Sequence, residues 1–97
     1  MSVKILKFSS TWCAPCKTMQ PIFERVSKNE EFKDIEFCSY DIENDDEGVE
    51  LVEKYNIRSI PSIVIVDGNN NAMKKIIGLV QENELINIIK DTIKYES

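Results

Sequence analysis

The sequence predicts an α/β fold in which helices cover both faces of a four-stranded mixed sheet. Two observations lead to this prediction. Short apolar runs typical of strands alternate with segments whose apolar residues recur every three to four positions, as in helices. The last two strand-like runs are separated only by "DGNNN", residues 67–71, the strongest turn signal in the chain. The predicted order is β-α-β-α-β-β-α, and residues 1–97 are expected to form one domain.

The first strand is predicted over residues 3–9, "VKILKFS", and the first helix over residues 14–28. Four apolar residues of this helix form a single stripe: Met19, Ile22, Phe23 and Val26. Pro15 fits the first turn of the helix, where its missing N–H is no loss. Pro21 lies inside the helix and should kink its axis.

The second strand is predicted over residues 35–41, and a helix of about ten residues follows the loop "ENDDEG". Val49, Val52 and Tyr55 are expected to form the inward face of that helix. Residues 62–66, "SIVIV", are almost continuously apolar, which is typical of a strand covered on both faces.

The chain then returns after the tight turn as a strand over residues 72–78. The last helix is predicted over residues 82–95, with four residues facing inward: Leu85, Ile88, Ile89 and Ile93. Because helices occupy the first two connections, we expect the first three strands to be mutually parallel and the fourth to be antiparallel.

The composition excludes some classes of function. The formal net charge of −5 argues against a nucleic-acid partner, because phosphate binding needs a basic surface. The apolar runs are too short to span a membrane. The segment after Met1 lacks the apolar stretch and cleavage site of a signal peptide, so we expect a cytoplasmic protein.

The chain has three cysteines, Cys13, Cys16 and Cys38, which is not the even number of a disulfide framework. A C-x-x-C pair in a reducing compartment is either redox-active or metal-binding. Zinc requires four ligands, and without histidine a complete Cys/His site cannot be built, so a metal site would need dimerisation or carboxylate ligands. We therefore expect no metal. Cys38, in the middle of a strand, is expected to be buried and inert.

The predicted order places Cys13 at the start of the first helix. The free N–H groups and the helix dipole stabilise an anion there, and a thiolate is the reactive species in disulfide exchange. Lys17 adds positive charge nearby. Cys16 lies one turn further in, where it is suitably placed to attack a mixed disulfide on Cys13. The position therefore predicts an exposed attacking thiol and a sheltered resolving thiol.

Two separated motifs resemble the thioredoxin family. The first is "WCAPCK" with Pro21 downstream, and the second is "YNIRSIPSIVIV", followed by a strand-turn-strand and "IIGL". The resemblance covers nearly the whole chain and implies a thioredoxin-like fold. Thioredoxins usually begin with an additional strand and helix, whereas this sequence begins almost directly on the strand before the cysteines. We therefore expect a smaller core that lacks these two elements.

The resemblance implies a role for each residue of the first motif. Cys13 matches the nucleophile and Cys16 the resolving cysteine, and together they would form the redox disulfide Cys13–Cys16. Trp12 matches a tryptophan of the contact surface; it could also be a partly buried packing residue, and both interpretations can be true. The usual Gly-Pro between the cysteines is Ala14-Pro15 here, and this dipeptide influences the redox potential while Ala14 belongs to the substrate-facing surface.

The second motif implies a substrate platform. Pro61 matches the family's cis-proline beside the dithiol, and the alternative is an ordinary proline at the start of a strand. Ile60 would then offer backbone groups to an extended substrate segment. Gly78 matches a glycine near the substrate groove, where a bare backbone allows close approach.

The sequence departs from the family six residues before Cys13. The family has a buried aspartate there, and this chain has Lys7. A buried ammonium near the dithiol would favour a thiolate, an uncharged amine could act as a base, and a third possibility is that Lys7 reaches solvent at the end of the sheet. The family's lysine partner on the second strand falls near Ser39.

The sequence therefore predicts a protein disulfide reductase that uses Cys13 and Cys16 and needs no bound cofactor. We expect a monomer that acts on protein disulfides and is recycled by a thioredoxin-reductase-like protein or another dithiol. One alternative is a thioredoxin-fold binding subunit of a complex, in which redox activity is incidental. Another is a disulfide oxidase, and the redox potential distinguishes it from a reductase.

Overall fold

A computed structural model describes residues 2–94, and the predicted order of elements is confirmed. The strands are β1 (Lys4–Ser9), β2 (Glu36–Asp41), β3 (Ser62–Val66) and β4 (Ala72–Ile77), and the helices are α1 (Ala14–Ser27), α2 (Asp46–Lys54) and α3 (Glu82–Ile93). A short 3-10 turn, η1 (Glu30–Phe32), was not predicted. The helix predicted over residues 82–95 ends earlier in the structure, and residue 95 lies outside the described residues. α1 runs unbroken through Pro21.

The four strands form one mixed sheet in the order β2-β1-β3-β4. β1 and β2 are parallel, whereas β3 is antiparallel to β1 and β4 is antiparallel to β3. The prediction of a parallel third strand is therefore wrong, while the antiparallel turn between the last two strands is confirmed.

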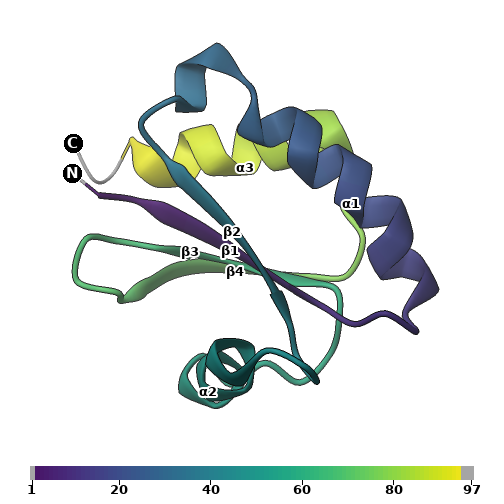
Figure 1. Ribbon diagram of the computed structural model, residues 1–97. Helices are drawn as coiled ribbons and strands as arrows, with labels where there is room; N and C mark the ends of the chain where they lie inside the picture. Colours follow the sequence, from purple (N-terminus) through teal and green to yellow (C-terminus); the bar gives the residue numbers. More distant parts are fainter. Residues whose placement is uncertain (1, 95–97) are drawn as a thin grey trace.

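The reason lies in the direction of α2. Its nine residues span about 14 Å, and Figure 1 shows the helix nearly end-on while the strands run across the view. α2 thus crosses the strands and does not carry the chain back along them. β3 begins at Ser62, paired with Phe8 near the end of β1. The chain therefore re-enters the sheet at the same end of the strands at which β2 left it, and β3 runs in the opposite direction.

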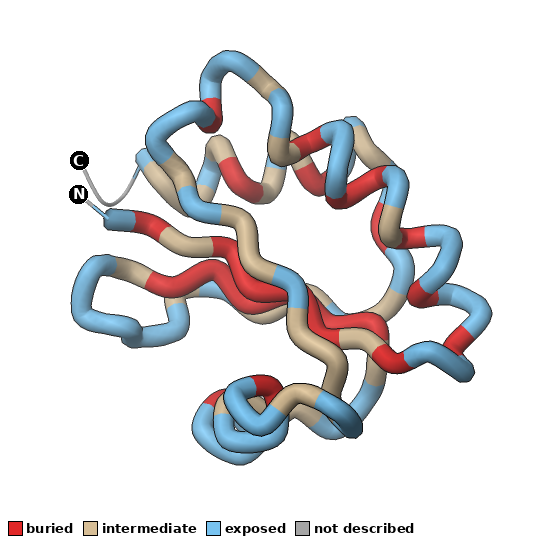
Figure 2. The backbone as a smooth tube through the Cα atoms, in the orientation of Figure 1, coloured by how far each residue is buried: buried red, intermediate tan, exposed pale blue. Residues whose placement is uncertain are grey.

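The helices cover both faces of the sheet, as predicted. α1 and α3 lie on one face and α2 lies on the other (Figure 1). The central strands β1 and β3 carry the longest runs of buried residues (Figure 2), and all five residues of β3 are buried. The core beneath α1 and α3 includes Ile5, Met19, Phe23, Leu85 and Ile89, and the core beneath α2 includes Leu6, Phe8, Tyr55, Val64 and Val66. Within residues 2–94, no helix is long and apolar enough to cross a membrane.

The predicted inward face of α2 is confirmed for Val52 and Tyr55 and wrong for Val49, whose place is taken by the preceding residue, Gly48. Val49 is 50% exposed, whereas Gly48 is buried and Val52 and Tyr55 pack against the sheet. A Cβ on Gly48 would lie 2.8 Å from the carbonyl oxygen of Asp41, so α2 approaches the end of β2 through this glycine. A search for apolar residues overlooks a stripe that begins with glycine.

Candidate active site

The loop after β1 delivers Cys13 to the start of α1. The backbone N–H of Cys13 donates to the Ser10 carbonyl at 3.4 Å, which closes a turn. Cys13 is the N-cap of α1, and its Sγ accepts a hydrogen bond from the Cys16 backbone N–H at 3.2 Å. The sulfur therefore lies where free N–H groups and the helix dipole stabilise a negative charge. The predicted helix-start position is confirmed.

Cys13 and Cys16 are joined by a disulfide with their Cα atoms 5.2 Å apart, so the structure represents the oxidised form. Cys13 is 5% exposed and Cys16 is 4% exposed. The predicted contrast between an exposed and a sheltered thiol is therefore wrong for this form. The two residues differ in another way, because Cys13 lines a surface groove and Cys16 does not.

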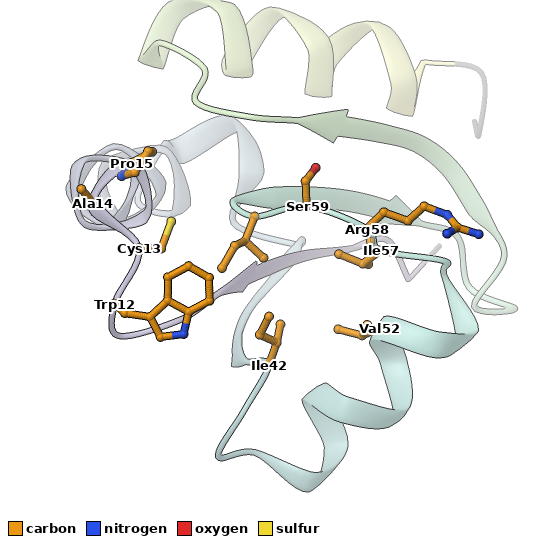
Figure 3. A pocket seen from close by; sticks show the side chains of 10 residues that line it. Trp12, Cys13, Ala14, Pro15, Ile42, Val52, Ile57, Arg58 and Ser59 are labelled. Carbon is orange, nitrogen blue, oxygen red and sulfur yellow. The ribbon is translucent and has the colours of Figure 1, made fainter.

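The groove has a volume of about 500 Å³ and runs from the dithiol toward α2 (Figure 3). Its walls are mostly apolar. One wall consists of Trp12, Cys13, Ala14 and Pro15, and the other consists of Ile42, Val52, Ile57, Arg58, Ser59 and Ile60. The structure thus brings five of the predicted site residues together at one surface.

Trp12 is 66% exposed, so most of its surface is available for contact. Its indole Nε1–H donates to Glu43 Oε1 at 2.6 Å. Glu43 lies in the loop between β2 and α2, and its hydrogen bond fixes the orientation of the ring at the mouth of the groove. An exposed aromatic ring with one polar end held in place is a suitable contact surface for another protein.

Pro61 lies behind the groove wall. The Ile60–Pro61 peptide bond is cis, and Pro61 itself is buried. Its carbonyl accepts a hydrogen bond from the Gly78 N–H at 2.8 Å. Gly78 has a φ of 90°, which favours glycine, but a Cβ there would meet no atom within 4 Å and Gly78 does not line the groove. The backbone conformation of Gly78 therefore explains the glycine, and crowding by neighbouring atoms does not.

Lys7 is 1% exposed, so the alternative that it reaches solvent is wrong. Its Nζ donates to Gln20 Oε1 and lies 5.4 Å from the centroid of the Phe23 ring. Burial lowers the pKa of Lys7, and the charge of Glu24 acts in the opposite direction. Ser39 is the register partner of Lys7 on the neighbouring strand β2. Lys17, in contrast, lies exposed on α1 and outside the groove lining.

Cys38 is only partly buried, so the prediction of a fully buried residue is wrong. Its Sγ–H donates to Glu36 Oε2 at 3.5 Å. Burial and this interaction with Glu36 raise the pKa of the Cys38 thiol, which keeps it protonated near neutral pH. Among residues 2–94, no three or more Cys, Asp or Glu side chains gather as a metal site.

Sequence reasoning missed three kinds of site residue: the apolar wall formed by Ile42 and Ile57, the cation Arg58, and Glu43, the partner of Trp12. Ile57 and Arg58 belong to the motif "IRSIP", so the motif itself could have identified them. Ile42 and Glu43 carry no local signal, because the fold alone brings the end of β2 beside the dithiol.

Comparisons with known proteins agree with this geometry. The family model described as Thioredoxin matches residues 2–91. Thioredoxin of Mycoplasmoides gallisepticum is 36% identical over 86 residues, which are 89% of this chain and 80% of that protein. Thioredoxin of Rickettsia bellii is 36% identical over 92% of this chain and 80% of that protein.

Solved structures give the same result. The oxidised mitochondrial thioredoxin 3 of Saccharomyces cerevisiae superposes with a TM-score of 0.76 and 28% identity, over 93% of this chain and 78% of that chain. The thioredoxin Mala s 13 of Malassezia sympodialis gives a TM-score of 0.82 over 94% of this chain and 75% of that chain; at 24% identity this likeness shows the fold alone.

Proposed function

We propose a role for each site residue from the premise that this chain belongs to the thioredoxin family and is a thiol–disulfide oxidoreductase, a protein disulfide reductase. The observation that carries the proposal is the position of Cys13. The sulfur of Cys13 caps α1 and is bonded to the sulfur of Cys16. Of the two cysteines, Cys13 is the one that lines the groove. Cys13 is therefore the nucleophile and Cys16 the resolving thiol.

The proposed reaction has two exchange steps. The Cys13 thiolate attacks one sulfur of a target disulfide, and the other target sulfur leaves as a thiolate that takes a proton from water. The Cys16 thiolate then attacks Cys13 Sγ, so the Cys13–Cys16 bond forms and the second target thiolate is released. The target gains two electrons and two protons, and the dithiol of the reductase becomes a disulfide.

The groove walls would receive the target chain. Trp12, Ala14 and Ile60 offer apolar surface on either side of Cys13. Ile60 precedes β3, where its backbone groups can pair with an extended segment of the target. Pro61 has no N–H to offer such a segment, and its carbonyl accepts a hydrogen bond from the Gly78 N–H. Pro61 and Gly78 therefore support the platform from behind.

Pro15 and Lys17 would modulate the dithiol. Pro15 lies in the first turn of α1, where its fixed φ favours the helix start that presents N–H groups to Cys13 Sγ. Lys17 lies one turn after Cys13 and adds a screened positive charge at the surface. The proposed electron donor is a thioredoxin-reductase-like protein or another dithiol, and the proposed location is the cytoplasm, where thiols are kept reduced.

Reduction of insulin disulfides by dithiothreitol tests this function. We expect catalytic amounts of the protein to accelerate insulin reduction and Cys13→Ser to abolish the acceleration. Serine is a good N-cap residue, so this variant keeps the start of α1 while losing the nucleophile. No acceleration by the unaltered protein would contradict the proposal and favour a binding subunit with the same fold.

A further inference from the structure

Lys7 is the only charged residue among the buried residues that the structure describes. It lies on β1, six residues before Cys13, and its side chain points to the face covered by α1. The two exchange steps described above leave this residue without a role. A buried ammonium is costly unless it is paired, so its surroundings need an account.

The contacts of Lys7 favour the charged form of its amine. The Nζ atom donates to the amide oxygen of Gln20 and lies 5.4 Å from the centroid of the Phe23 ring. The Gln20 amide nitrogen in turn donates to Glu24 Oε1 at 2.8 Å. An amide oxygen polarised by a carboxylate and the negative face of an aromatic ring both stabilise a cation.

The other elements packed around Lys7 contribute no charge among the described residues. Its neighbours in the sheet are Ser39 of β2 and Ile63 of β3. α3 presents the apolar residues Leu85 and Ile89 to this core. Glu24 is therefore the charge that acts against the lowering of the Lys7 pKa by burial.

The same contacts place the ammonium against α1, one helical turn after Cys16. Gln20 follows Cys16 by four positions on α1, so the two residues share one face of the helix at a separation of about 6 Å. Cys16 is buried, like Lys7, and lies on α1 itself. In such an interior a unit charge acts on a neighbouring group far more strongly than in water, and dissolved salt screens it little.

We propose that Lys7 is a positioning residue for the reductase reaction: its buried ammonium stabilises the Cys16 thiolate that resolves the mixed disulfide. This inference rests on the proposed function. Cys13 caps the helix N-terminus and lines the groove, whereas Cys16 has neither feature, and burial alone makes a thiol less acidic. The Cys16 proton goes to water, the thiolate attacks Cys13 Sγ, and the target sulfur leaves with the bonding electron pair. Lys7 keeps its own proton throughout.

Lys7→Met tests the proposal, because it keeps the bulk of the side chain and removes the charge. Reduced protein with ¹³C-labelled cysteine Cβ atoms gives the pKa of Cys16 by NMR titration, and rapid mixing of reduced protein with oxidised glutathione gives the rate at which the transient Cys13 mixed disulfide is resolved. We expect the pKa of Cys16 to rise by about one unit and the rate at pH 7 to fall about tenfold. Lys75→Met is the matched control, because its Nζ contacts the Asn56 carbonyl on another part of the sheet, and both values should stay unchanged.

Gln20→Glu is the second test, and it carries the proposal if Lys7→Met does not fold. A carboxylate beside Nζ would pair with the ammonium and cancel its field at Cys16, so the pKa of Cys16 should rise although Lys7 is still present. The unaltered protein adds a third test, since a Cys16 pKa above the value of about 8.5 for a free cysteine would overturn the proposal.

Two further outcomes would overturn it. One is a folded Lys7→Met variant in which the pKa of Cys16 is unchanged. The other is slower resolution without a change in that pKa, which would mean that an uncharged amine acts as a base. Failure of this inference is distinguishable from failure of the proposed function, because insulin reduction by the unaltered protein tests only the latter.

Discussion

At the scale of single residues, the reactivity of each cysteine depends on the hydrogen-bond partner of its sulfur. Cys13 Sγ already accepts the Cys16 N–H in the disulfide form. After reduction the same N–H faces a thiolate, and a hydrogen bond to an ion is roughly twice as strong as one between neutral groups. The cap of α1 therefore favours the thiolate over the protonated thiol at Cys13. Cys38 shows the opposite arrangement, since a carboxylate is its partner.

Replacement of Glu36 tests this contrast. Burial and Glu36 raise the pKa of the Cys38 thiol, so its thiolate fraction at pH 8 is smaller than that of a free cysteine. With Cys13 and Cys16 oxidised, iodoacetamide should alkylate Cys38 more slowly than N-acetylcysteine, and Glu36→Gln should speed the reaction. Mass spectrometry measures the rate, and alkylation as fast as that of N-acetylcysteine would show that the thiol is not suppressed.

Trp12 provides a second test at this scale, because it is the only tryptophan in the chain and its fluorescence is specific. The Glu43 carboxylate holds its indole N–H at 2.6 Å. Glu43→Ala should release the ring and lower the fluorescence anisotropy of Trp12, whereas Glu43→Gln keeps an acceptor oxygen and should preserve most of it. Equal anisotropy in the alanine variant and the unaltered protein would mean that the hydrogen bond does not hold the ring.

At the scale of elements, the packing of α2 depends on a residue without a side chain. Gly48 lets the helix lie against the end of β2, where a Cβ would come within 2.8 Å of the Asp41 carbonyl oxygen and 3.1 Å of Tyr40 Cβ. Val52, one turn further along the same helix, lines the groove.

Gly48→Ala sets helix propensity against this packing. Alanine favours a helix interior by about 1 kcal/mol over glycine, but forcing a methyl group into a close contact with backbone costs about 1–3 kcal/mol. We expect a net loss of stability in urea unfolding. Val49→Ala, at the exposed neighbouring position, should change the free energy of unfolding little. A more stable Gly48→Ala variant would show that α2 can move away from β2.

Much of this element structure could be predicted from the sequence. The apolar stripes of α1 and α3 and the continuous run of β3 have the periodicity of their elements, and each was located to within a few residues. The direction of β3 could not be predicted this way. A helix between two strands suggests a parallel crossover, but periodicity does not show whether that helix runs along the strands or across them.

At the scale of the whole molecule, the reversed β3 is what assembles the site. The C-terminal ends of β1 and β2 lie side by side, and β3 starts at the same end of the sheet. Cys13, Ile42 and Ile60 therefore line one groove although they are far apart in the sequence. A parallel β3 would have placed Ile60 and Pro61 at the opposite end of the strands, away from Cys13. The second motif therefore indicated that Pro61 lies beside the dithiol, which the order of helices and strands does not indicate.

Two loops of the molecule depend on carboxylates that cap backbone N–H groups. Asp41 accepts from Glu43 and Asn44, and Asp67 accepts from Asn69 and Asn71. These hydrogen bonds hold the pKa of both carboxyls below the ordinary value of 3.8.

Because the folded pKa is lower than the unfolded one, this stabilisation is complete above the unfolded pKa and is lost as the pH falls through the folded value. We expect the double variant Asp41→Asn, Asp67→Asn to be less stable than the unaltered protein at pH 7, and the difference to shrink below pH 4. Urea unfolding at both pH values measures it, with Asp34→Asn as a control outside these loops. A difference independent of pH would contradict the assignment.

The most direct test of the central claim is to stop the reaction between its two steps. In the reduced Cys16→Ser variant, Cys13 should attack a disulfide such as oxidised glutathione and remain as a stable mixed disulfide, because no resolving thiol follows. Intact-mass and peptide analysis should find one adduct on Cys13 in this variant, and none at that position in Cys13→Ser. An adduct confined to Cys38, or a stable adduct on Cys16 in the Cys13→Ser variant formed as fast as the one on Cys13, would contradict the assignment of nucleophile and resolving thiol.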